Sequence, residues 1–215
     1  MKKYVSGWLA AITVALFAVA LPAAAQNVGQ EYVPIVPAQA TDNPAKIEIT
    51  EFFSYGCPHC SDFHQPVSNW AARLPADVTF RRIPISFGRA QWLNLSKLFY
   101  ALEATGELAN LDGAVFNALH AKGLKLYDDK SIAEWVTGQG IDAKKFSDAY
   151  NSFGVVSKAK RGDQLAQGSK IQGVPALVID GKYLIINEGT KDYADLLARA
   201  DKVIEKVRVE RNKKK

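Results

Sequence analysis

Two cysteines separated by two residues are the part of this sequence best suited to chemistry. Cys57 and Cys60 are the only cysteines in the 215-residue chain, and Pro58 and His59 lie between them. Two thiols at this spacing can close into a disulfide and open again, which moves two electrons in each cycle. The thiolate is the form that attacks. The pair therefore indicates thiol–disulfide exchange.

The neighbouring residues predict how the two sulfurs differ. An apolar run over 47–53 leads into the pair, and a helix-like pattern leads out of it. Cys57 then falls at a helix N-cap, with Pro58 at the first helical position, where a missing N–H costs nothing. Unpaired N–H groups and the helix dipole favour an anion there, and His59 adds a donor, or a cation when protonated. We predict that Cys57 is the exposed attacking thiolate and Cys60 the more buried resolving thiol.

Three other interpretations of the pair are open. A structural disulfide over so short a loop would stabilise the fold by about 2 kcal/mol, against about 4.7 kcal/mol for a loop of about 100 residues. A metal half-site would need further ligands, and His59, His64 and His120 are the only histidines. Two inert buried thiols are the third. We favour the redox site, with no metal and no cofactor, and interpret His64 and His120 as structural.

Two further motifs could serve the same site. Glu51 lies on the predicted strand, six residues before Cys57. It is either a surface residue or a partly buried acid with a raised pKa that carries protons to or from Cys60. Val174 and Pro175 directly precede another apolar run. Pro175 is either a simple strand-start proline or the cis-proline of a thioredoxin-like fold, which would turn Val174 towards the sulfurs to bind an extended peptide.

The periodicity predicts an α/β fold. Asp180 and Gly181 form a tight turn between two short apolar runs. We expect a strand over 47–55, a helix that starts at 57 and a second strand over 78–85. A block of helices over 92–165, a hairpin over 176–186 and a last helix that ends at about 207 complete the expected order.

Several side chains are predicted to shape the helices. Ser131, followed three residues later by Glu134, has the pattern of a capping box. Asp142 and Thr190 are predicted N-caps. Pro66 lies inside the first helical pattern and predicts a kink there.

The first 25 residues have the pattern of a secretory signal peptide. Lys2 and Lys3 precede an apolar run over 5–21, and small residues at 23–25 precede Gln26. A retained anchor is the alternative, because the run is a little shorter than the roughly 20 residues of a membrane span. Cleavage would deliver a soluble protein to an oxidising compartment, where a disulfide persists.

The net charge of +5 is unevenly distributed. Basic residues crowd the last eight positions, where we expect a basic, solvated tail over 209–215 that frays. A nucleic-acid surface needs basic residues spread over a folded face. We therefore expect no nucleic-acid partner.

The motifs together resemble a known family. The sequence EFFSYGCPHC over 51–60, the helical block, and the Gly-Val-Pro-Ala stretch over 173–176 before a Gly-Lys-Tyr hairpin resemble the DsbA family of periplasmic thiol:disulfide interchange proteins. The Pro-His pair between the cysteines and the Val before the proline are similar to that family. The resemblance implies a thioredoxin-like domain over 26–89 and 169–208, with a helical domain inserted over 90–168.

The resemblance also implies a function. It predicts donation of the Cys57–Cys60 disulfide to newly exported proteins in the periplasm, and reoxidation by a DsbB-like inner-membrane quinone reductase. We expect a monomer. By position, the resemblance makes Cys57 the nucleophile, Cys60 the resolving thiol and His59 the residue that stabilises the thiolate. It makes Glu51 a buried acid with Arg82 as the nearby base, and it places the cis-proline loop at Val174 and Pro175.

Other functions fit the same motifs. The runner-up is a reductase or an isomerase with the same fold. A reductase would differ in its redox poise, which the sequence does not determine, and an isomerase of the DsbC type would need an additional dimerisation domain. A non-catalytic peptide-binding chaperone, or a metallochaperone that uses the cysteine pair, belongs to a different class.

Overall fold

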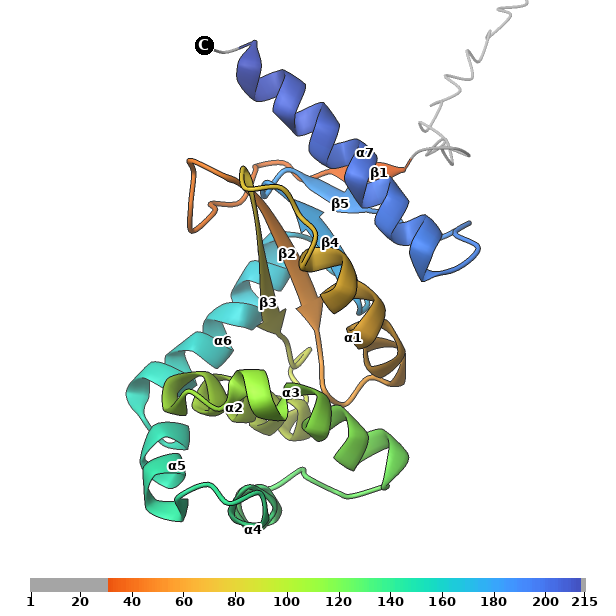
Figure 1. Ribbon diagram of the computed structural model, residues 1–215. Helices are drawn as coiled ribbons and strands as arrows, with labels where there is room; N and C mark the ends of the chain where they lie inside the picture. The colour runs from red at the N-terminus through yellow and green to blue at the C-terminus, as the bar shows by residue number, and fades with distance from the viewer. Residues whose placement is uncertain (1–30, 214–215) are drawn as a thin grey trace, which may run out of the picture.

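The computed structural model describes residues 31–213, which form a five-stranded mixed sheet, flanking helices and a helical insert (Figure 1). The predicted α/β class is confirmed. The predicted signal peptide over 1–25 lies outside the described residues. The strands, in the spatial order β1-β5-β4-β2-β3, are β1 (Tyr32–Pro34), β2 (Ile47–Phe53), β3 (Val78–Pro84), β4 (Ala176–Ile179) and β5 (Tyr183–Ile185).

The sheet is built around β2. All seven residues of this strand are buried, Glu51 among them. It pairs in parallel with β3 and antiparallel with β4. A strand that is apolar towards both faces is expected where other elements cover both sides of a sheet. The parallel register places Glu51 directly opposite Arg82 of β3.

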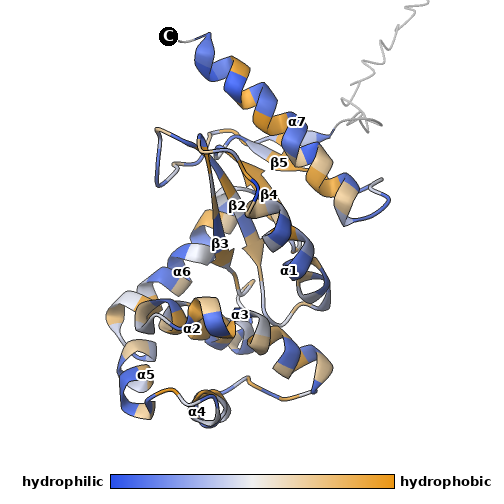
Figure 2. Cartoon of the chain, viewed as in Figure 1, coloured by the Kyte–Doolittle hydropathy of each residue, from blue (hydrophilic) through white to orange (hydrophobic). Residues whose placement is uncertain are grey.

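Helices cover the two faces of the sheet. Helices α1 (Pro58–Ala71) and α7 (Tyr193–Asn212) lie over one face, where Ile49 belongs to their buried cluster. Helix α6 (Phe153–Gly168) reaches the other face near its C-terminal end, in a cluster with Ile83. Figure 2 shows β4 as apolar throughout and α7 as a mixture of apolar and polar residues, as a helix with one covered face requires.

The helical insert occupies 90–168, between β3 and β4. Its core continues into the start of α1, because Cys57 and Cys60 lie in the same buried cluster as Leu95 and Phe99. The division into separate domains over 26–89 with 169–208, and over 90–168, stays a prediction. The insert contributes α2 (Ala90–Thr105), α3 (Leu108–Phe116), the π-helical turn η1 (Asn117–Ala121), α4 (Asp129–Gly138), α5 (Ala143–Tyr150) and α6.

Two predicted local features are confirmed. The Asp142 side chain caps α5 by accepting a hydrogen bond of 2.7 Å from the N–H of Lys145. Asp180 and Gly181 adopt φ angles of 56° and 64°, the left-handed conformation that a tight hairpin turn needs.

Three details differ from the sequence prediction or extend it. Helix α4 begins earlier, because Asp128 is its cap and Ser131 is the third residue of the capping box, so the box predicted to start at Ser131 is wrong. Asp192, and not Thr190, caps α7, since the Thr190 hydroxyl donates to the Asn187 carbonyl instead. Helix α1 continues through Pro66 to Ala71.

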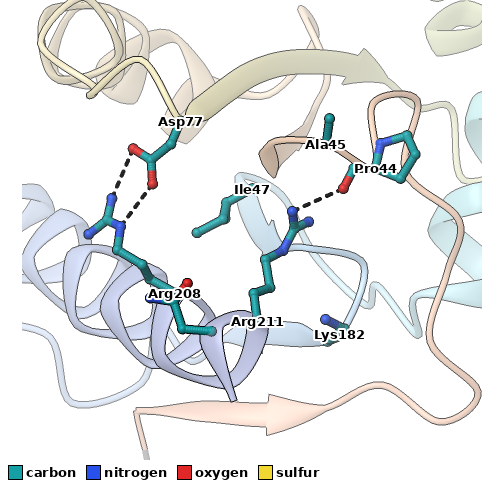
Figure 3. A pocket seen from close by; sticks show the side chains of 8 residues that line it. Pro44, Ala45, Ile47, Asp77, Lys182, Arg208 and Arg211 are labelled. Atoms are coloured by element: carbon teal, nitrogen blue, oxygen red, sulfur yellow. Dashed lines mark hydrogen bonds and ion pairs between the residues drawn. The ribbon is translucent and has the colours of Figure 1, made fainter. Parts of the chain in front are cut away.

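The last helix is longer than predicted. Helix α7 extends to Asn212, so the expectation of a fraying tail is wrong for 209–212. Figure 3 shows Arg208 paired with Asp77, and Arg211 donating to the Pro44 carbonyl, around a pocket of about 660 Å³. Arg211 also pairs with the buried Asp180. Among residues 31–213, no helix combines the length and apolar character needed to cross a membrane.

The Arg211 contacts predict a stability loss when they are removed. In Arg211→Ala, Asp180 stays buried with only Lys182 beside it, and we expect the free energy of unfolding to fall by about 1–3 kcal/mol. Urea unfolding at neutral pH measures this change. The control is Lys144→Ala, which removes an exposed pair with Asp148 and should cost under about 0.5 kcal/mol. Equal stabilities for the two variants would contradict the prediction.

Candidate active site

The cysteine pair lies at the N-terminus of α1, as predicted. Cys57 is the N-cap in an extended conformation, and Pro58 follows at the first helical position. Both cysteines are free thiols in this structure. The prediction of an exposed Cys57 needs correction, because its accessible fraction is 7%, compared with 0% for Cys60. Cys57 is nevertheless the more accessible sulfur, and a partner thiol would reach it first.

The surroundings push the pKa values of the two thiols apart. A hydrogen bond from the Cys60 thiol, followed by the backbone N–H groups of Cys60 and His59 and the charge of His59, lowers the pKa of Cys57 to about 6, although burial opposes this. Burial, the hydrogen bond to Cys57 and the Cys57 charge raise the pKa of Cys60 well above its usual range. At neutral pH the pair therefore holds one thiolate, at Cys57, and one thiol.

The Val174–Pro175 loop lies against the attacking sulfur. The Val174–Pro175 peptide bond is cis, and the Cys57 sulfur lies 3.4 Å from the Val174 carbonyl oxygen, to which it donates when it is protonated. Asn187, which the sequence analysis did not single out, donates to the Pro175 carbonyl over 3.0 Å. Beside this loop, residues 170–176 and 184–188 line most of a groove of about 460 Å³. Val174 thus lines the groove and also lies beside the Cys57 sulfur.

A glycine and an aromatic ring close the other side of the site. A Cβ atom at Gly56 would lie 2.5 Å from Nε1 of Trp92. Phe87 and the Arg89 guanidinium lie against the same indole ring. A side chain at position 56 would therefore require Trp92 to move.

Glu51 is the buried acid beneath the pair. Its accessible fraction is 0%, so the surface interpretation is wrong. Arg82 Nε donates to Glu51 Oε2 over 2.7 Å, and the expected basic neighbour is therefore present. Burial raises the pKa of Glu51 above its usual value, although Arg82 opposes this rise. Glu51 also contributes to the raised pKa of Cys60, which places the carboxyl within electrostatic reach of that thiol.

Asp112 of α3 extends this ion pair beyond the predicted residues. It accepts hydrogen bonds from Tyr55 and from Arg82 Nη1, and its Oδ2 lies 3.6 Å from His64 Nδ1. Asp112 carries no sequence signal, because one acid in a helical pattern more than 50 residues from Glu51 has no visible partner.

The two histidines outside the motif have partners that the sequence did not reveal. His64 lies beside Asp112, and His120 Nε2 lies 2.7 Å from the Tyr55 carbonyl. Among residues 31–213, no three His, Cys, Asp or Glu side chains are arranged to hold a metal ion.

Comparison with known proteins places this geometry in a family. The model of the DSBA-like thioredoxin domain matches residues 48–199. The chain belongs to the DsbA family. It is thus a thiol:disulfide oxidoreductase with a thioredoxin-like fold, whose cysteine pair matches the redox pair of that family.

Individual relatives support this assignment. The thiol:disulfide interchange protein DsbA of Azotobacter vinelandii is 38% identical over 213 residues, which are 97% of this chain and 99% of the relative. The Bordetella parapertussis protein of the same name is 38% identical over 198 residues, 91% of this chain and 93% of the relative. The crystal structure of Pseudomonas aeruginosa DsbA superposes with a TM-score of 0.81 at 36% identity, covering 86% of this chain and 95% of that one.

The Cys60 hydrogen bond predicts how the Cys57 pKa responds to substitution. The ultraviolet absorbance of the thiolate should titrate at a pH of about 6 in the reduced protein. Cys60→Ala removes the largest cause of the lowered pKa, so the midpoint should rise, whereas Cys60→Ser keeps a donor and should move it less. A midpoint that stays near its original value in Cys60→Ala would show that another group stabilises the thiolate.

Proposed function

We propose that this protein is a dithiol oxidase that donates its Cys57–Cys60 disulfide to reduced, newly exported polypeptides in the periplasm. The observation that carries the proposal is the position of Cys57 at the N-cap of α1, where the Cys60 thiol and backbone N–H groups donate to its sulfur and lower its pKa to about 6. Each pKa unit stabilises the thiolate by about 1.4 kcal/mol, which corresponds to about 30 mV for a two-electron couple. A stabilised reduced form makes the disulfide a stronger oxidant.

The exchange proceeds in two steps. A substrate thiolate attacks Cys57 Sγ, the Cys57–Cys60 bond breaks, and Cys60 leaves as a thiolate that takes up a proton. A second substrate thiolate then attacks the substrate sulfur of the mixed disulfide, and Cys57 leaves as a thiolate. The substrate loses two electrons and gains a disulfide, while the protein gains two electrons and becomes the dithiol. The low pKa of Cys57 makes it a good leaving group in the second step.

Reoxidation reverses the role of Cys60. The Cys57 thiolate attacks the disulfide of a membrane partner linked to quinone, and one thiolate leaves. The Cys60 thiol then gives up its proton and attacks Cys57 Sγ, which releases the second partner thiolate. Val174 and Pro175 are proposed to hold the substrate or partner peptide, since the Val174 carbonyl lies 3.4 Å from the Cys57 sulfur and extended peptides bind through main-chain groups.

Glu51 is proposed to exchange the proton with Cys60. It is buried, its Oε1 has no hydrogen-bond partner within residues 31–213, and its pKa is raised by burial. A carboxyl group with a raised pKa can both give and take a proton near neutral pH. His59 is proposed to stabilise the Cys57 thiolate, since its backbone N–H and its charge both lower the pKa of Cys57.

The role of Glu51 predicts a selective effect of Glu51→Gln. Reduced protein mixed with a symmetrical aromatic disulfide releases coloured thiol in two phases, the first from attack by Cys57 and the second from attack by Cys60. Glu51→Gln should slow the second phase by about a hundredfold and remove the part of its pH dependence that reports Glu51.

The control for this experiment is Glu48→Gln, which alters another glutamate buried on β2 and paired with Arg81. It should leave the second phase unchanged. A second phase with the same pH profile in Glu51→Gln and the original protein would remove Glu51 from the mechanism.

Equilibration with a glutathione redox buffer tests the oxidase assignment itself. The oxidised and reduced forms are distinguished by thiol alkylation, and we expect the Cys57–Cys60 disulfide to oxidise glutathione almost completely. His59→Ala should make the pair less oxidising, because the Cys57 thiolate loses one source of stabilisation. A potential as reducing as that of thioredoxin would overturn the assignment and leave a reductase that receives electrons from another partner.

A further inference from the structure

The buried cation next to Glu51 is shared between two carboxylates. Arg82 donates from Nε to Glu51 Oε2 and from Nη1 to Asp112 Oδ2. Glu51 is on the central strand β2, whereas Asp112 is on α3 of the helical insert. A guanidinium presents separate donors in a fixed plane, so it can bind two carboxylates at once. How much of its charge acts on Glu51 then depends on Asp112.

Other contacts hold Asp112 and Arg82 in place. The Tyr55 hydroxyl donates to Asp112 Oδ1, and Tyr55 has an accessible fraction of 0%. The Arg82 guanidinium lies 3.9 Å from the centre of the Phe53 ring. The arginine is therefore fixed by a ring and two acids.

The charged and titratable groups around Asp112 come from each element that meets here. His64 of α1 has 18% of its side chain accessible, and Asp112 has 17%. Both are screened only in part by water. The groups that contact Asp112 directly are Tyr55, His64 and Arg82. Glu51 of β2 is joined to them through Arg82, His120 of η1 lies against the Tyr55 carbonyl, and the two thiols lie at the start of α1.

We propose that Asp112 is a positioning residue that sets the pH at which Glu51 exchanges its proton with Cys60. The proposal rests on the role of Glu51 proposed above and adds the residue that controls it. Asp112 competes with Glu51 for Arg82 and places a second negative charge near it. Both effects favour the protonated form of Glu51. The helical insert therefore acts on the proton transfer through one carboxylate.

The electrostatics of the site support this direction. Asp112 is among the causes that raise the pKa of Glu51, and Arg82 is among those that lower it. Within residues 31–213, Asp112 forms its hydrogen bonds and ion pairs with Tyr55, Arg82 and His64, and not with Cys57. A change at Asp112 should therefore alter the Cys60 step and leave the Cys57 step unaffected, which a general loss of structure would not do.

Asp112→Asn tests the proposal in the two-phase reaction with an aromatic disulfide. In the second phase, the Cys60 S–H bond breaks with transfer of its proton to Glu51, the Cys60–Cys57 bond forms, and the aromatic thiolate leaves Cys57. Without the Asp112 charge, Glu51 should ionise at lower pH. The acid limb, which is the low-pH range where the rate of the second phase rises with pH, should therefore shift to lower pH by about one unit. At a pH within that range, the second phase should be about tenfold faster.

The first phase and a matched variant serve as controls. The first phase reports Cys57 and should keep its pH profile. The matched variant is Asp129→Asn. Asp129 also belongs to the insert, accepts a hydrogen bond from the Tyr150 hydroxyl and lies beside Lys97. Within residues 31–213, the acids that pair with Arg82 are Glu51 and Asp112 and not Asp129, so Asp129→Asn should move neither phase.

Tyr55→Phe gives a test of opposite sign if Asp112→Asn does not fold. Without the hydroxyl donor, Asp112 should attract Arg82 more strongly, Glu51 should lose part of its pairing, and the acid limb should move to higher pH. An acid limb that stays in place in both variants, or moves in the direction opposite to that expected, would overturn the proposal.

The Glu51→Gln background separates the two assignments. There, adding Asp112→Asn should cause no further shift of the second phase. If Glu51→Gln changes the profile and Asp112→Asn does not, the inference about Asp112 fails and the role of Glu51 stands. If Glu51→Gln changes nothing, both fail.

Discussion

The structure depends on the different surroundings that one helical turn gives to two identical side chains. Cys57, at the N-cap of α1, has the backbone N–H groups of His59 and Cys60 beside its sulfur, and Cys60, three residues later, is enclosed. The same turn makes the enclosed thiol a hydrogen-bond donor to the other sulfur. One sulfur is thereby ready to ionise and the other resists ionisation. Without this asymmetry, the order of attack in a disulfide exchange would not be defined.

The rest of the fold shields that helical turn from solvent and places the charged side chains near it. The insert packs Leu95 and Phe99 into the same cluster as both cysteines, so it encloses the active site as well as enlarging the protein. The parallel pairing of β2 with β3 brings Arg82 opposite Glu51, and α7 reaches the motif where the Tyr193 hydroxyl donates to the His59 carbonyl. Separate elements therefore converge on one short helical turn.

Local features could be predicted from the sequence because few residues determine them. The N-cap at Cys57, the cap at Asp142 and the turn at Asp180 and Gly181 each depend on neighbours within about four residues. Ser131 was misplaced within its capping box because Asp128 and Ser131 are both good caps, and the choice depends on how the helix packs. Caps and turns of this kind can therefore be predicted from the residues next to them.

Long-range features could not be predicted from spacing. Arg82 was found only through the resemblance. Asp112 and Asn187 were missed, and the partner of His120 was not predicted, because the residues that they contact lie far away along the chain. A single sequence records which side chains are polar but not which of them meet. The network around Glu51 appears only after the insert is docked against the sheet.

The distance along the chain between Cys57 and its cover has a consequence for biogenesis. The Val174 carbonyl that lies on the Cys57 sulfur comes 117 residues later in the chain, and β4, which completes the pairing of β2, follows directly after it. Contacts of such large separation form late, because the loop between them must be closed first. A chain that emerges N-terminus first therefore exposes both cysteines until the segment that carries Val174 has joined the sheet. The order of synthesis and the order of burial are thus opposed at the one turn where burial matters most.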